Sequence, residues 1–172
     1  MAERLSFEQI YAEHFQFVWR SLRALGVPSS MAEDAAQDVF VVVHRRLPDF
    51  QGEQYVRTWL FAIAMRVASD HRRRTRSFEE LSVADSILDQ GPSPLDVTVQ
   101  NEALQLLDRA LAQMDEHHRL VFFLMDVEEL RASEVSEILS INVNTVYSRL
   151  NRARERFNEI VTRLGAPRSS KG

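Results

Sequence analysis

Apolar residues recur along most of the chain at alternating spacings of three and four, the period of a helix buried on one side. In the N-terminal half this pattern predicts three helices, over about residues 6–25, 30–47 and 54–76. In the C-terminal half it predicts helices over about 101–114 and 120–127, followed by a shorter helix and a long one. The chain is therefore expected to be all-α.

Two helix starts carry their own sequence signal. Ser6 is followed by Gln9, and Ser30 by Glu33, the spacing at which a hydroxyl and a longer polar side chain cap each other's backbone N–H groups. The run Val39–Val43 has high strand propensity. No turn signal separates it from its polar flanks, so we assign it to the helix and expect one of its sides to dock on a partner.

The punctuation of the chain predicts two small helical domains. Gly91-Pro92-Ser93-Pro94 is the clearest break, and it lies in a stretch without a sustained helical stripe. We expect a first domain over residues 1–76, an acidic flexible linker over 77–99, a second domain over 100–165 and a tail over 166–172.

The last part of the chain has the pattern of a helix-turn-helix. A short amphipathic segment after Arg131 ends in a tight polar turn, and a second helix follows. Its buried stripe comprises Val146, Leu150, Ala153, Phe157, Ile160 and Leu164. Its other face carries Asn144, Thr145, Tyr147, Ser148, Asn151 and Arg152, which include side chains that hydrogen-bond base edges and phosphates. The alternative is a surface helix with a merely solvated face; the turn, the stripe and the arginines favour a recognition helix.

The net charge of −4 is unusual for a nucleic-acid-binding protein, but the charge is unevenly distributed. Residues 57–76 hold six arginines against the single acid Asp70, and residues 142–164 hold five arginines against two glutamates. Residues 77–108 contain no Lys or Arg. Because screening limits the reach of a charge to about 10 Å, a phosphate responds to the local charge rather than to the total.

The same sequence argues against an enzyme. It has no cysteine, and no two of its five histidines have the i, i+4 spacing of a helical metal site, so neither a metal nor a cofactor is expected. Asp34 and Asp38 share a helical face without a basic or histidine partner at matching spacing, which favours a binding face over catalysis. The apolar runs are too short to cross a bilayer and no signal segment begins the chain, so a cytoplasmic location is expected.

The helix over 54–76 combines arginines with the aromatic residues Tyr55, Trp59 and Phe61. Aromatic side chains are stacking platforms for unpaired bases, and arginines follow the backbone of a single strand. Single-stranded or distorted DNA is one interpretation. The other, about equally supported by this segment alone, is that the aromatics are core and the arginines a solvated helix end.

In this order, the segments resemble a bacterial sigma-70-family factor of the extracytoplasmic-function (ECF) group. Residues 33–40 resemble region 2.2, residues 58–66 regions 2.3 and 2.4, and residues 134–154 region 4.2. The resemblance implies a transcription initiation factor without chemistry of its own. Its expected partners are core RNA polymerase (the β′ clamp helices and the β flap), promoter DNA and an anti-sigma factor.

The resemblance also implies three sets of site residues. The polymerase-binding set is Asp34, Gln37, Asp38, Phe40 and Val41. The set for the −10 element is Arg57, Thr58, Trp59, Arg66, Asp70, Arg73 and Arg74. The set for the −35 element is Asn144, Thr145, Tyr147, Ser148, Asn151 and Arg152.

Several residues depart from the family pattern. Arg66 stands where the family commonly has the Asn associated with a flipped −10 base. Ser140 and Asn144 replace two glycines of the turn region, and Arg131 replaces a capping hydroxyl. We expect Asn144 to tolerate the backbone angles of a glycine position. The alternative function is a one-component regulator, with a ligand-sensing N-terminal domain and DNA binding that needs no polymerase.

Overall fold

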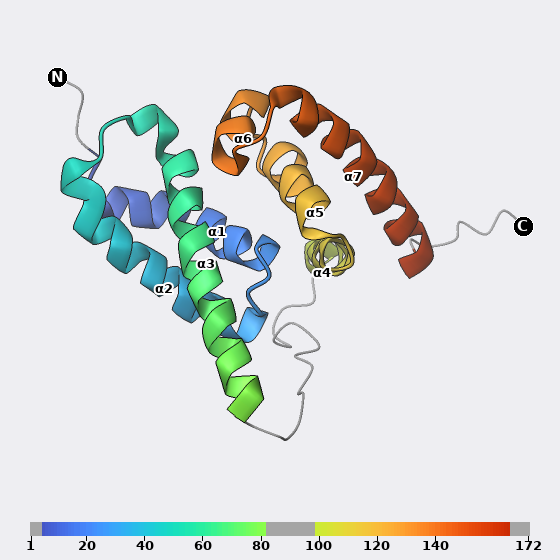
Figure 1. Cartoon of the computed structure of the whole chain (residues 1–172), viewed down its shortest axis with the longest axis horizontal. Coiled ribbons are helices and arrows are strands. Elements are labelled where there is room, and N and C mark those ends of the chain that lie inside the picture. Colours follow the sequence, from blue (N-terminus) through green and yellow to red (C-terminus); the bar gives the residue numbers. More distant parts are fainter. Residues whose placement is uncertain (1–4, 82–98, 166–172) are drawn as a thin grey trace, which may run out of the picture. The chain divides into compact units, whose positions relative to one another are not determined.

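The computed structural model describes residues 5–81 and 99–165, and every regular element in these two stretches is a helix (Figure 1). The chain divides into two compact units, Met1–Gln90 and Gly91–Gly172. The first contains α1 (Phe7–Ala24), α2 (Ser29–Arg46), the 3₁₀ turns η1 (Leu47–Asp49) and η2 (Glu53–Tyr55), and α3 (Val56–Leu81). The second contains α4 (Val99–Ala112), α5 (Glu116–Phe122), η3 (Phe123–Val127), α6 (Ala132–Leu139) and α7 (Val143–Leu164). The all-α prediction is confirmed.

In the first unit α1, α2 and α3 each pack against the other two. Leu22 of α1, Val39 of α2 and Leu60 of α3 are fully buried. Five alanines of α2 and α3 are also fully buried, which lets the helices approach closely: Ala32, Ala35, Ala36, Ala64 and Ala68. The outward faces of α2 and α3 carry mostly polar side chains.

Of the two predicted capping boxes, one is confirmed and one is wrong. The Ser6 backbone N–H donates to Gln9 Oε1 at 2.9 Å, and the Gln9 N–H donates to Ser6 Oγ at 3.2 Å. In contrast α2 begins at Ser29, and its N-cap Pro28 makes no side-chain capping hydrogen bond. Proline fixes its own φ near the helical value, so the helix starts without the Ser30–Glu33 box.

The valine-rich run is helical, as expected. Val39, Phe40 and Val43 are buried, whereas Val41 is 50% exposed. Burial against two neighbouring helices therefore outweighs the strand propensity of the run. Val41 is left as an exposed apolar position on α2.

The third helix is longer than predicted. α3 continues to Leu81, so the first five residues of the expected linker are helical. The first glycine or proline after the start of the expected linker is Gly91, so residues 77–81 contain no helix-breaking residue. The rest of the expected linker, 82–98, and the expected tail, 166–172, lie outside the described residues.

In the second unit α7 packs against α4, α5 and α6. Its predicted stripe is confirmed: Val146, Leu150, Ala153 and Ile160 are buried, and Phe157 and Leu164 are partly buried. Phe157 also stacks on Phe122 of α5, with ring centroids 4.6 Å apart. The stripe holds α7 in one rotational setting, so its polar face points outward.

The helix predicted over 120–127 changes type in the middle. After α5, the chain forms η3, a π-helix, in which the Glu128 N–H donates to the Phe123 carbonyl oxygen at 2.9 Å. A π turn holds more residues than an α turn and is typical of functional sites or one-residue insertions. Leu130 then donates to the Leu124 carbonyl oxygen at 2.8 Å and closes the approach to α6.

The turn of the helix-turn-helix is tight because Ser140 adopts a left-handed backbone, with φ 53° and ψ 45°. The Ile141 N–H donates to the Ser136 carbonyl oxygen at 3.1 Å, which closes the end of α6. Asn144 lies within α7 and its φ is not positive, so the expected tolerance is not tested there. Asn142 caps α7, and its side-chain oxygen accepts from the Asn144 N–H at 2.8 Å.

At the start of α6 only one of the two hydrogen bonds of a capping box is present. Arg131 has no side-chain acceptor with which to cap the helix. The Glu134 carboxylate accepts from the Arg131 N–H at 2.8 Å and replaces half of a capping box.

We predict that Ser140→Gly stabilises the second unit by about 1 kcal/mol, because a left-handed backbone costs a non-glycine residue about 1–2 kcal/mol. Urea unfolding followed by circular dichroism measures the change. Glu155→Gly, at an exposed position inside α7, is the matched control and should destabilise by about 0.5–1 kcal/mol. A loss of stability in Ser140→Gly would contradict the strain.

Candidate functional site

The outward face of α2 brings together four of the five residues predicted to bind polymerase. Asp34, Gln37, Asp38 and Val41 are exposed and follow one another at helical spacing, so they form one stripe. Gln37 Nε2 donates to the Tyr11 hydroxyl of α1 at 3.3 Å. We call these four residues the α2 stripe.

The fifth residue, Phe40, is not on the stripe. Its side chain is 2% exposed, so it has almost no surface for a direct contact. It packs among aromatic side chains of α1, with ring centroids 4.7 Å from Tyr11 and 6.0 Å from Phe15. Phe40 therefore supports the stripe from below.

One residue of the α2 stripe is tied to α3. His71 Nε2 lies 2.7 Å from Asp38 Oδ2. The His71 side chain is 9% exposed and that of Asp38 is 53% exposed, so the hydrogen bond runs from the interior to the surface. The sequence analysis did not predict this contact.

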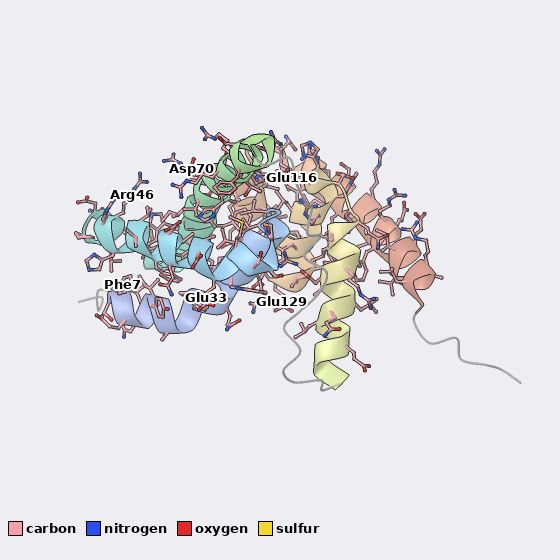
Figure 2. The ribbon with its side chains drawn as sticks, turned by 90° about the horizontal axis from the view of Figure 1, so that it is seen from below. Phe7, Glu33, Arg46, Asp70, Glu116 and Glu129 are labelled. Atoms are coloured by element: carbon pink, nitrogen blue, oxygen red, sulfur yellow. The ribbon has the colours of Figure 1, made fainter. Side chains whose placement is uncertain are left out.

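A second stripe runs along α3. Trp59, Ala62, Arg66, Asp70 and Arg73 follow at steps of three and four, which places them on one side of the helix. Figure 2 marks Asp70 on α3 and Glu33 on α2. Arg73 donates to Asp70 at 3.2 Å, an exposed pair, whereas no partner within the described part of the chain holds the exposed Arg66.

The start of α3 is held by aromatic contacts. Trp59 stacks on Phe50, with ring centroids 4.1 Å apart and planes 17° apart. Arg57 lies 4.7 Å over the Phe17 ring. The Thr58 hydroxyl is buried without a hydrogen-bond partner in the described residues. Three predicted −10 residues thus lie close to the core.

The aromatic residues of the segment predicted as the 54–76 helix divide between core and surface positions. Phe61 is fully buried and belongs to the core. Trp59 is half-buried, and Tyr55 is 50% exposed. Arg66, Arg73 and Arg74 are exposed along the helix, so α3 carries a basic surface that begins beyond Trp59.

The polar face of α7 presents the predicted −35 residues to solvent. Asn144, Ser148, Asn151 and Arg152 are exposed, Tyr147 is 52% exposed, and Thr145 is half-buried. All six lie in the first half of the helix, immediately after the turn. We call this surface the α7 face.

The arginines of α7 fall into two groups. Arg154 donates to both carboxylate oxygens of Asp126 at 2.7 Å each, and these bonds raise the pKa of its guanidinium. Arg156 pairs with Glu159 at 3.4 Å, and Arg163 donates to Gln113 at 2.8 Å. Arg149 and Arg152 have no side-chain partner within the described ranges, so they remain available to a ligand.

Sequence reasoning missed three residues near these surfaces: Tyr11, Phe50 and His71. Each acts through a contact to a residue on another helix or turn, which periodicity does not reveal. For Tyr11 and Phe50 the only sequence signal was their aromatic character. For His71 it was the presence of a polar residue in the apolar stripe of α3.

Among residues 5–81 and 99–165, no group of three or more His, Asp or Glu side chains could hold a metal ion. No helix in the same ranges is long and apolar enough to span a membrane.

Comparisons with known proteins match both units. The family described as sigma-70 region 2 matches residues 10–78, and the one described as sigma-70, region 4 matches residues 104–157. The chain is 30% identical to the RNA polymerase sigma factor YlaC of Bacillus subtilis over 169 residues, covering 95% of this chain and 96% of that protein.

Two other proteins are similar over most of their length. The ECF RNA polymerase sigma-E factor of Escherichia coli is 28% identical over 160 residues, covering 87% of this chain and 84% of that protein. A solved structure of the sigma factor RpoE in complex with the anti-sigma factor NepR, from Bartonella quintana, has a TM-score of 0.71 at 21% identity. It covers 91% of this chain and 96% of that chain, and it supports the fold.

We predict that Arg57→Ala raises the pKa of His14. Burial lowers the pKa of His14, the Glu13 carboxylate raises it and the Arg57 guanidinium lowers it further. Removing the cation should move the pKa upward, though not above its usual value, because burial is the largest cause. NMR titration of the imidazole measures it.

Glu13→Gln is the control of opposite sign and should lower the pKa of His14 further. Since the pKa of His14 is lower in the folded state than in the unfolded one, its contribution to stability is lost as the pH falls below about 6.5. Arg57→Ala should reduce this loss. An unchanged titration would show that Arg57 does not sit beside His14.

Proposed function

Because this chain belongs to the ECF group of the sigma-70 family, we propose that it binds core RNA polymerase and directs it to promoters. One observation carries the proposal: the region 2 and region 4 matches each fall within one compact helical unit, in the family's order. A relative at 30% identity is covered over 96% of its length, so the likeness extends to the whole arrangement of segments.

The α2 stripe is the proposed polymerase-binding surface. Asp34, Gln37 and Asp38 offer carboxylates and an amide, and Val41 adds an exposed apolar side chain between them. An apolar contact surrounded by polar groups is the usual composition of a protein interface. The β′ clamp helices of polymerase are the proposed partner for this stripe, and the β flap for the second unit.

We call the stripe of Trp59, Ala62, Arg66, Asp70 and Arg73 the α3 stripe. Together with the adjacent Arg74, it is the proposed surface for the melted −10 element. Arg66 and Arg74 are exposed cations that can follow a phosphate backbone. Trp59 keeps its indole half-buried against Phe50 at the start of the stripe, which is a fixed position for an aromatic platform. Melting costs a few kcal/mol per base, and capture of an unstacked base offsets that cost.

The α7 face is the proposed reader of the −35 duplex. A recognition helix enters the major groove with its N-terminal residues, and the six predicted residues occupy that part of α7. Of these, Arg152 is the cation without an internal partner, so its guanidinium can reach guanine or a phosphate. The amide and hydroxyl groups of Asn144, Ser148 and Asn151 can hydrogen-bond base edges.

We propose that the chain performs no catalysis itself and that polymerase carries out RNA synthesis. The cytoplasm, which holds the polymerase and the promoter, is its proposed place of action. An anti-sigma factor is the proposed inhibitor, since the similar RpoE was solved with one.

A one-component regulator is the less favoured alternative. It requires a ligand-sensing N-terminal domain, whereas the region 2 family matches residues 10–78. It also predicts promoter binding that does not depend on polymerase. Run-off transcription with purified core polymerase on a promoter library distinguishes the two functions.

In that assay we predict that Val41→Asp abolishes run-off transcription. The exposed position should tolerate the change, but binding would desolvate a charge, so affinity for core polymerase should fall by about tenfold or more. Fluorescence titration with labelled polymerase measures it. Gln16→Asp, on an exposed site of α1, should leave the affinity unchanged. Equal affinities for both variants would remove α2 from the interface.

For the α7 face, we predict that Arg152→Ala weakens promoter binding by the holoenzyme and Arg154→Ala does not. Arg152 is free, whereas Arg154 is occupied by Asp126. Loss of a good base contact should cost about 1–3 kcal/mol. Filter binding to the −35 duplex at several salt concentrations measures the loss.

If Arg152 touches only phosphate, its loss should weaken binding equally on all sequences and reduce the salt dependence. Equal effects of the two substitutions would mean that pairing within α7 does not decide which arginine meets DNA.

For the α3 stripe, we predict that Arg66→Ala with Arg73→Ala leaves polymerase binding intact and reduces open-complex formation. A template with a premelted −10 bubble should restore much of the activity, because the unpairing cost has already been met. Permanganate footprinting of −10 thymines measures melting. Normal thymine reactivity on a fully duplex promoter would exclude these arginines from melting.

A further inference from the structure

His71 is a polar residue in an apolar position. The side of α3 that faces the core contains Leu60, Ala64, Val67 and Ala68, and position 71 continues this stripe by helical spacing. A histidine there is 93% buried, by its 7% exposure. Burying a polar side chain costs free energy that an apolar residue would not cost. The position is therefore explained by what the imidazole contacts rather than by packing alone.

Its contact is the Asp38 carboxylate of α2. Because a carboxylate only accepts hydrogen bonds, His71 Nε2 carries the hydrogen, and the 2.7 Å separation is that of a strong charge-assisted bond. Nδ1 of His71 is buried with no hydrogen-bond partner among the described residues. The ring thus directs its one hydrogen bond at a residue of the α2 stripe.

The hydrogen bond from His71 holds one carboxylate oxygen of Asp38 and leaves the other without a partner among the described residues. Oδ2 accepts from His71, while the side chain as a whole is 53% exposed. Within the described residues Asp38 has no other hydrogen bond or ion pair, so its second oxygen is not held by the protein and is open to a donor from outside. A carboxylate held by one oxygen offers the other in a fixed direction, which reduces the ordering cost when a donor binds.

We propose that His71 is a positioning residue for polymerase binding: it orients Asp38 so that the outer oxygen meets a cationic or N–H donor on the polymerase. The inference rests on the proposed function, since it needs the α2 stripe to be the docking surface. It adds to that stripe a residue that lies on α3 and cannot itself reach the partner.

This role makes a prediction that a purely structural role does not. Leucine at position 71 would suit the apolar stripe, and Asp38 is exposed enough to be hydrated once the imidazole is lost. The loss of one partner is costly where the other charge stays buried, but the Asp38 side chain is 53% exposed and water can replace the imidazole. Polymerase affinity should therefore fall while the free energy of unfolding does not.

The test is a double-mutant cycle read as the affinity of the full chain for core polymerase. His71→Leu should weaken binding by about fivefold to tenfold, and Asp38→Ala by at least as much. Once Asp38 is alanine, His71→Leu should add less than about twofold. His71→Gln should stay within about twofold of wild type, because its amide nitrogen reaches the position of Nε2.

Two controls separate orientation from packing. Thr75→Val alters the next turn of α3, where the threonine hydroxyl lies 3.7 Å from the Met31 sulfur of α2, and should leave affinity unchanged. Urea unfolding of each variant shows whether the unit stays folded. If His71→Leu does unfold it, His71→Asn replaces it, because the shorter amide does not reach Asp38 and should weaken binding equally.

The outcomes distinguish this inference from the proposed function. Three results would overturn the positioning role alone. His71→Leu could bind polymerase with full affinity, Thr75→Val could lose as much affinity as His71→Leu, or the fold-losses of His71→Leu and Asp38→Ala could multiply in the double mutant. Full affinity in Asp38→Ala would remove Asp38 from the docking surface and the inference with it. Loss of run-off activity in Val41→Asp would still support the docking surface in that case.

Discussion

The described helices bury their apolar residues against neighbouring helices and leave the other positions to solvent, and that limit determines the rest of the structure. In the first unit the limit is met by fully buried alanines in α2 and α3, which leave little space between the helices. A helix that packs so closely cannot rotate without exposing its core side. The stripes on α2 and α3 are therefore fixed as soon as the core forms, before any partner is present.

Helical periodicity was sufficient to predict the elements and the outward faces. It identified the valine-rich run as helix and the six positions of the α7 stripe, since both depend on spacing alone. It failed where backbone geometry decides: α2 begins at Ser29, after Pro28, rather than with the Ser30–Glu33 capping box, and α3 continues to Leu81. Contacts such as His71 with Asp38 span 33 positions, and no local pattern predicts them.

The charges show why a chain of net charge −4 can still offer basic surfaces. Within α7, Arg154 and Arg163 hydrogen-bond residues outside the helix, Asp126 and Gln113, and Arg156 pairs with Glu159 on the helix itself. Arg152, on the outward face, has no such role within the described residues. Counting arginines in the sequence therefore overestimates the positive charge available to DNA, and the partners of each guanidinium decide which ones count.

The π turn at Phe123–Val127 also affects how this chain can change in length. A π turn accommodates an extra residue within a helix. Deleting one residue there would leave the four-residue spacing of an α-helical bond in place of the five-residue spacing between Glu128 and Phe123. The same deletion within α7 would rotate every later side chain by about 100° and turn the buried stripe toward solvent. Single-residue insertions and deletions are thus expected to be tolerated at η3 and to disrupt the fold within α7.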